Sequence, residues 1–325
     1  MSIFYPARLL ADWVSFDLFG LAPETLAGEA VNYFIFDTIK VFLLLAVIIY
    51  IVSFIRTYLP PKKIQNILSR KNKYFGHVLA GLLGIITPFC SCSAVPLFLG
   101  FVEAGVPLGV TFSFLVSSPM INEVALVLLF SMFGWKIAVL YVLSGLLIAI
   151  FSGIAIGFFN AERLLADFIN KNRASQNAMP LLQMTFKDRR KYARNYVKSI
   201  IKKVWPYVIA GIGLGAWIHG YAPTDFLASY AGADKWYAVP VATLIGIPLY
   251  SNAAGIIPLV SALTEKGVAM GTALAFMMAV TALSLPEFMI LKKVMKIRLI
   301  IIFASVVGIG IMFTGYMLNY LLNLN

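Results

Sequence analysis

The chain has 325 residues, of which 61% are hydrophobic and 12% charged, with a formal net charge of +12. This composition excludes an ordinary soluble domain and is typical of a polytopic membrane protein. The positive charge does not indicate nucleic-acid binding, because most Lys and Arg residues gather in three short segments between apolar blocks, at 62–73, 163–203 and 292–298. Basic segments of this kind are typical of cytoplasmic loops, so we expect a multi-pass protein of the inner (plasma) membrane.

The first segment, residues 1–32, is predicted to be an acidic, extracytoplasmic N-terminal region. It carries four acids against a single base, Arg8. We expect no cleavable signal peptide, because no basic region precedes an apolar run.

A first membrane repeat is predicted at 33–159. An apolar block at 41–55 crosses the membrane, and a second apolar helix follows at 137–159. Between them, 74–103 has about thirty residues with a break in its middle, whereas two full crossings need about forty. We therefore expect a re-entrant hairpin that enters from the cytoplasm, with its tip at 88–93, followed by one crossing at 106–133.

A basic cytoplasmic linker at 160–203 leads to a second membrane repeat at 204–325. This repeat is predicted to contain a helix at 204–219, a hairpin with its tip at 248–254, a crossing at 268–291 and a last helix to residue 321. The hairpin follows a weakly charged loop, so we expect it to enter from the outside.

The two halves match at an offset of 162 residues. The coinciding pairs are Pro96 and Pro258, Glu103 and Glu265, Gly105 and Gly267, and Gly109 and Gly271. Because one half enters its hairpin from a basic loop and the other from a weakly charged one, the repeats are predicted to be inverted. The expected fold is an all-α integral membrane protein with about six full spans and two broken or re-entrant hairpins, thus about eight to ten membrane helices. Both termini are then extracytoplasmic.

Both cysteines of the chain, Cys90 and Cys92, lie at the first hairpin tip. On unwound backbone a Cys-x-Cys pair can present both sulfurs to one soft centre, such as Cu(I), Zn(II) or trivalent arsenic. The same pair can exchange with a thiol partner, or can pack as small apolar side chains. The cysteines are therefore candidates for substrate and metal binding, although two thiols do not complete a structural zinc site.

Hydroxyl and amide side chains at the tips and helix breaks are further candidates for substrate binding. They are Thr87, Ser91, Ser93, Ser118, Asn122, Ser251 and Asn252. Satisfying freed backbone groups is the alternative role for these side chains.

Two carboxylates, Glu123 and Glu287, follow prolines inside apolar spans and are candidates for proton coupling, because ionisable groups at membrane depth are usually functional. An interfacial position at a helix end is the alternative. We expect no ligand role for His77 and His219. The sequence has no phosphate-binding loop and no nucleophilic triad, so we expect neither an enzyme nor a cofactor.

Two motifs, Thr87-Pro-Phe-Cys-Ser-Cys-Ser-Ala-Val-Pro96 and Ser117-Ser-Pro-Met-Ile-Asn-Glu123, resemble those of the predicted permeases of the ArsP/YraQ type. The resemblance covers about residues 41–321. It implies efflux of a thiol-reactive substrate such as a trivalent organoarsenical, with Cys90 and Cys92 at matching positions.

The leading hypothesis is a secondary-active permease that exports a small soft substrate. The alternatives are a transmembrane thiol or sulfur-species transporter working with a thioredoxin-like partner, and a passive channel. The expected partners are the lipid bilayer, a small-molecule or ion substrate, a thioredoxin-like or metal-binding protein, and further copies of the chain in a homo-oligomer.

Overall fold

The computed structural model describes residues 4–57, 73–87, 91–159, 164–165, 185–221, 235–249, 253–292 and 294–323. Within these ranges the chain is almost entirely helical, and β-structure is confined to isolated bridges such as Leu165–Met295. The prediction of an all-α integral membrane protein is confirmed.

The N-terminal residues form a short helix, α1 (Tyr5–Asp12), and a π-helical turn, η1 (Trp13–Leu18), which fold back on α2 (Leu26–Arg56). The Asn32 amide donates to the Asp12 carboxylate at 2.8 Å and links α1 to α2. Because α2 begins at Leu26, the boundary expected at residue 32 lies inside a helix.

Each half contains a pair of helices that are too short to cross a bilayer. In the first half these are α4 (Lys73–Ile86) and α5 (Ser91–Glu103), with 14 and 13 residues. At 1.5 Å per residue they are about 20 Å long, against a hydrocarbon thickness of about 30 Å. The second half has α12 (Ala238–Gly246) and α13 (Ala253–Glu265), with 9 and 13 residues. These lengths fit re-entrant hairpins.

A broken helix follows each hairpin. In the first half α6 (Leu108–Met120) and α7 (Glu123–Phe133) are bent by 49° at their junction, and in the second half α14 (Met270–Ala282) leads into α15 (Leu285–Leu291). A long helix then closes each half, α8 (Trp135–Phe158) and α16 (Ile297–Asn323). The remaining long helix is α10 (Phe186–Tyr221), which begins inside the predicted linker.

Four stretches in the described residues are long and apolar enough to cross a membrane, and a fifth is added if the bent α6–α7 pair counts as one span. They are Leu26–Ile51, Trp135–Phe158, Met270–Leu291 and Ile297–Leu322. Six spans were expected. The sixth, at 204–219, is the second half of α10 and is not among these stretches.

The helices repeat in the register that the sequence predicts. From Ser91 to Ala253, the first residues of α5 and α13, the offset is 162 residues, and α6, α7 and α8 precede α14, α15 and α16 by the same offset. The turns after α5 and α13 each need a glycine in the left-handed region, Gly105 at φ 82° and Gly267 at φ 85°.

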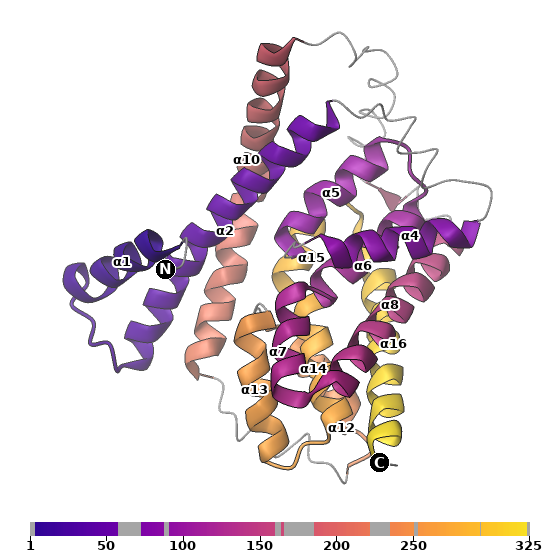
Figure 1. Ribbon diagram of the computed structural model, residues 1–325. Helices are drawn as coiled ribbons and strands as arrows, with labels where there is room; N and C mark the ends of the chain where they lie inside the picture. Colours follow the sequence, from indigo (N-terminus) through magenta and orange to yellow (C-terminus); the bar gives the residue numbers. More distant parts are fainter. Residues whose placement is uncertain are drawn as a thin grey trace.

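The first helices of the two halves, α2 and α10, lie side by side and run in opposite directions (Figure 1). At one end the rings of Phe54 and Phe186 are 5.6 Å apart and the Arg189 guanidinium donates to Thr57. Nearer the other end, Gly213 packs against Phe34. The repeats are therefore inverted. The Lys296 amide also donates to the Leu164 carbonyl at 2.8 Å, which brings together two segments predicted to be cytoplasmic.

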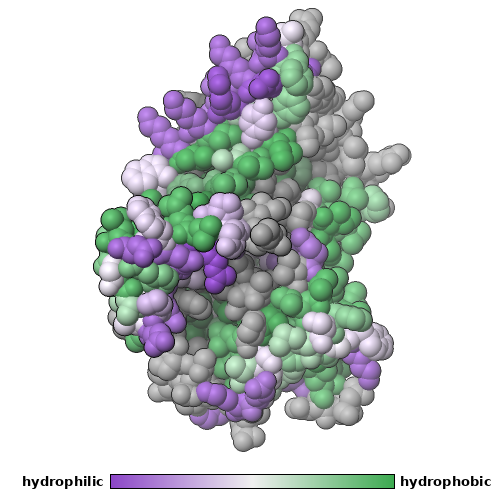
Figure 2. All heavy atoms as spheres, turned by 60° about the vertical axis from the view of Figure 1, so that its left-hand side comes forward, coloured by the Kyte–Doolittle hydropathy of each residue, from purple (hydrophilic) through white to green (hydrophobic). Residues whose placement is uncertain are grey.

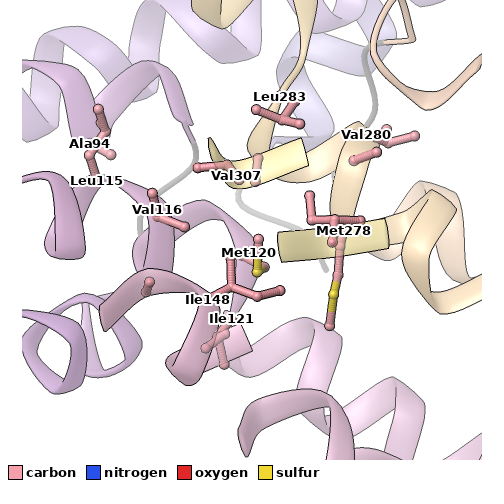
Figure 3. Close-up of a cluster of buried hydrophobic side chains, with 14 of the residues drawn as sticks. Ala94, Leu115, Val116, Met120, Ile121, Ile148, Met278, Val280, Leu283 and Val307 are labelled. Atoms are coloured by element: carbon pink, nitrogen blue, oxygen red, sulfur yellow. The ribbon is translucent and has the colours of Figure 1, made fainter. Parts of the chain in front are cut away.

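The halves meet in an apolar seam (Figure 3). Val116, Met120 and Ile148 of the first half and Met278, Leu283 and Val307 of the second belong to one cluster of buried hydrophobic side chains. A Cβ added at Gly310 would lie 3.2 Å from Ile148, its counterpart 162 residues earlier. The pseudo-twofold axis thus passes where α8 crosses α16.

Candidate functional site

The first hairpin tip lies between Thr87 and Ser91. Cys90 lies outside the described residues, as do Ser251 and Asn252 at the second tip. Cys92 belongs to the first turn of α5, where the backbone is described but the side chains of Ser91, Cys92 and Ser93 are not. Their predicted roles in binding a substrate or metal therefore remain predictions.

Thr87 closes the last turn of α4. Its hydroxyl donates to the carbonyls of Leu83 and Gly84 at 2.9 and 3.0 Å. The Leu83 carbonyl also accepts from the Thr87 amide at 3.2 Å, whereas the Gly84 carbonyl lies in the last turn, where intrahelical donors are missing. The arrangement matches the alternative role, satisfying freed backbone groups.

The first helix of each hairpin approaches the broken helix of its half closely at a glycine. A Cβ added at Gly84 of α4 would lie 3.0 Å from the Ser118 amide nitrogen and 3.1 Å from the Phe114 carbonyl oxygen of α6. The counterpart Gly246 of α12 approaches α14 in the same way, with the Val280 nitrogen at 3.3 Å. The first helix of each hairpin, α4 or α12, therefore ends beside the break of its own half.

The first break is held by hydrogen bonds at both of its ends. Asn122 caps α7, and its side-chain oxygen accepts from the Ala125 amide at 2.7 Å. Across the gap, the Tyr141 hydroxyl of α8 donates to the Met120 carbonyl at 2.8 Å. The side-chain oxygen of Asn122 therefore caps α7, and Tyr141, which the sequence did not single out, fixes the end of α6.

The second break is joined directly to the second tip. The Leu285 amide donates to the carbonyl of Ile247, just after α12, at 3.0 Å. Ser284 stands in the break at the position that Asn122 occupies 162 residues earlier, but it makes no side-chain cap. The repeat register alone could have identified Ser284 as a candidate.

Buried polar groups accumulate at these breaks. The hydroxyls of Ser118 and Ser284 are buried and have no hydrogen-bond partner among the described residues. Burying an unpaired hydroxyl costs free energy, which is a reason to associate such groups with a ligand or water. Glu287 is fully buried in the first turn of α15, whereas Glu123 is exposed at the start of α7.

Two polar pairs away from the breaks were not predicted. His77 is buried, and its Nδ1 lies 2.9 Å from the Ser113 hydroxyl of α6. Asp37 is buried in α2, 3.9 Å from the Lys40 ammonium. Spacing on a single helix did not reveal the first pair, because it joins different helices.

The described side chains contain no group of three or more His, Cys, Asp or Glu residues that could hold a metal ion. The side chains of both cysteines lie outside that set. The site as described thus consists of two half-length hairpins, two helix breaks, buried hydroxyls and one buried carboxylate, at the meeting of two inverted halves. Discontinuous helices of this kind form the substrate sites of many secondary transporters.

Comparison with known proteins agrees with this architecture. Relatives include the UPF0718 protein MJ0584 of Methanocaldococcus jannaschii, 24% identical over 74% of this chain and 82% of its own length. A Streptococcus mutans protein named as a two-component membrane permease complex subunit is 28% identical over 78% of this chain and 82% of its own length. The UPF0718 protein YraQ of Escherichia coli is 21% identical over 81% and 73%.

No solved structure matches the chain. The model of the ArsP_1 family, described as predicted permease, matches residues 26–320. This match includes both hairpins, both breaks and all the long helices, so the chain belongs to the ArsP_1 family of predicted permeases.

Proposed function

We propose that the chain is a secondary-active permease that moves a small, thiol-reactive or soft substrate through a site between its two hairpin tips. The observation that carries the proposal is the placement of each half-length hairpin beside the break of its own half, in one 162-residue register. In lipid, irregular backbone is tolerated only where it is buried in protein or lines a cavity. In many carriers, two inverted repeats each contribute broken helices of this kind to a central substrate site.

The proposed substrate class rests on Cys90 and Cys92. Thiolates prefer soft partners, and trivalent arsenic in a methylated or aromatic compound is one of them. The resemblance to arsenical efflux permeases gives export as the direction of transport. Ser118 and Ser284 would supply harder oxygen contacts to the same substrate or to its water.

Glu287 is the stronger candidate for proton coupling. It is fully buried in a stretch apolar enough to cross a membrane, whereas Glu123 is exposed. Each carboxylate lies in the first turn of the helix after its break, where the helix dipole stabilises negative charge. In this proposal Glu287 is the group that takes up and releases the coupled proton as the breaks move.

The contacts of α2 and α10 favour a carrier over a passive channel. Helices α4 and α5 each pack on α6, as α12 and α13 each pack on α14, and the crossed pairs α5–α15 and α7–α13 both occur. The α2–α10 pair departs from this symmetry. It packs through α2 on α5 and through α10 on α15, and the mirror pairs α10–α13 and α2–α7 are not among the substantial contacts of the described residues.

Two nearly equivalent halves can adopt this asymmetric packing in either direction. The inverse arrangement would place α10 on α13 and α2 on α7, and would expose the site to the opposite side of the membrane. Rocking of one unit against another around a fixed site is how inverted-repeat carriers alternate. A channel needs only one of the two arrangements.

A second candidate function is transport of a thiol or sulfur species with a partner protein. The relative from Streptococcus mutans, named as a subunit of a two-component permease complex, favours a partner. This function predicts a mixed disulfide between the partner and Cys90 or Cys92, trapped in single-cysteine variants.

Transport into inverted membrane vesicles tests the leading function. With a trivalent phenylarsenical and an imposed proton gradient, we expect uptake against the concentration gradient, and its loss in the Cys90→Ser/Cys92→Ser variant. Sulfur oxyanions and soft metal ions serve as competing substrates. Normal uptake by the double variant would remove the thiol role, and equilibration without accumulation would favour a channel.

A further inference from the structure

The first half of α10 has a strongly basic face that the transport site does not use. Its members are Lys187, Arg190, Lys191, Arg194, Lys198 and Lys202, and all six are exposed. At 100° per residue they fall within roughly a third of the helix circumference. Within the described part of the chain, none of them forms an ion pair with a carboxylate.

The opposite face of the same helix is packed against α2. Ala193 and Ile200 are buried, and the rings of Tyr192 and Tyr196 stack at 6.1 Å. The basic face is therefore fixed outward, and its side chains are free to reach a partner.

The neighbouring helix indicates which environment surrounds this face. On α2, Leu43, Val47 and Ile51 are 46–49% exposed and lie four residues apart, in one apolar stripe. Since α2 and α10 are antiparallel and touch near both ends of their shared length, this stripe lies at the level of Arg194, Lys198 and Lys202. At one level of the helix pair, the exposed surface of α2 is thus apolar and that of α10 is cationic.

Figure 2 displays the same combination, with hydrophilic side chains gathered at the end of the molecule where α10 begins and hydrophobic surface beside them. Trp205, which is 50% exposed, follows the basic half directly. It lies about one helical turn beyond Lys202, on the same face as the bases.

We propose that Arg194, Lys198 and Lys202 bind the phosphates of anionic phospholipids. The apolar stripe of α2 reaches the acyl chains at this level, and the long basic side chains extend to the headgroup plane. A soluble acidic protein would be matched by the cations but not by the adjoining apolar stripe. The surface therefore fits a lipid boundary, with juxtamembrane bases adding affinity for anionic lipid.

The test uses the full-length protein in nanodiscs that contain brominated phosphatidylglycerol or brominated phosphatidylcholine at equal fractions. Bromine quenches nearby tryptophan, and the Trp205→Phe variant identifies the part of the emission that Trp205 supplies. We expect stronger quenching of Trp205 by the glycerol lipid than by the choline lipid. The preference should fall by roughly fivefold for each base removed in Arg194→Gln/Lys198→Gln/Lys202→Gln.

A matched control removes three other exposed bases, in Lys136→Gln/Lys292→Gln/Arg298→Gln. It should keep the preference, as should the charge-conserving Lys198→Arg/Lys202→Arg. An undiminished preference in the first variant overturns the proposal, and so does an equal loss in the control. Displacement of the lipid by acidic peptide but not by raised phosphatidylcholine would assign the surface to a protein instead. If the triple variant does not fold, the charge-conserving variant and the single variants carry the comparison.

Discussion

The two carboxylates that follow the helix breaks look alike in sequence and differ in the fold. Glu287 is fully buried and Glu123 is exposed, although each stands in the first turn of its helix. An ionisable side chain that is buried at membrane depth needs a compensating function or partner. Burial therefore distinguishes two carboxylates that sequence spacing alone left as equal candidates.

We expect Glu287→Gln to lower proton-gradient-driven uptake by roughly tenfold or more, the range of typical coupling free energies. The amide keeps the size of the carboxylate but cannot bind and release a proton. Uptake into vesicles is measured at several imposed pH gradients, with Glu123→Gln as the control that should keep its pH dependence. If Glu287→Gln and the wild-type chain respond equally to the gradient, Glu287 is not the coupling group.

Gly84 tests the close approach of the first hairpin to α6. A methyl group there would overlap the Ser117 hydroxyl and would lie 3.0 Å from the Ser118 nitrogen and 3.1 Å from the Phe114 oxygen, both of which are backbone atoms. We expect Gly84→Ala to destabilise the fold by about 1–3 kcal/mol. Gly213→Ala, where the nearest atom of the described residues is at 3.6 Å, should leave stability unchanged or raise it. Denaturation of the purified protein compares the two, and equal stabilities would contradict tight packing at the break.

At the scale of helices, the two halves have the same close helix contact but use different side chains at the equivalent positions. In the first half His77 and Ser113 meet beside Gly153. At the same three positions, 162 residues later, Val239 and Ala275 meet beside Gly315. The close approach of the helices is therefore set by the glycines and does not depend on the polar pair.

We accordingly expect the double variant His77→Val/Ser113→Ala to fold with a stability within about 1 kcal/mol of the wild-type value, because both polar groups leave together. Ser113→Ala alone should cost about 1–3 kcal/mol, because it leaves the buried imidazole nitrogen without its partner. Thermal or denaturant unfolding measures both. A double variant that is less stable than the single one would mean that the first half depends on the polar pair.

At the scale of the whole molecule, the α2–α10 pair is the element whose contacts break the symmetry of the halves. This predicts two populations of distances between α2 and α7. Spin labels carried by non-natural amino acids at Leu43 and Val127, both exposed, leave the native cysteines in place. The two distances should differ by roughly 5 Å or more, and substrate or a proton gradient should change the ratio of the two populations. A single unchanged distance in actively transporting vesicles would contradict the alternation.

The sequence by itself determined the fold class, the register of the repeat and its inversion. Composition and charge distribution are properties of the chain, and the register was readable in Gly105 and Gly267 because the turn after each hairpin needs a glycine at positive φ. The membrane also limits the architectures that can satisfy the backbone, so hydropathy carries much of the topology.

Only the tertiary structure decided which polar groups are buried and which are committed to the backbone. Thr87 and Asn122 satisfy helix ends, whereas Ser118, Ser284 and Glu287 are enclosed by residues from other helices. Burial depends on neighbours that are far away in sequence, and no periodicity within one segment contains that information. The asymmetric packing of α2 and α10 could likewise not be predicted from the sequence. Two inverted copies are compatible with this arrangement and with its inverse, and only tertiary packing selects one of them.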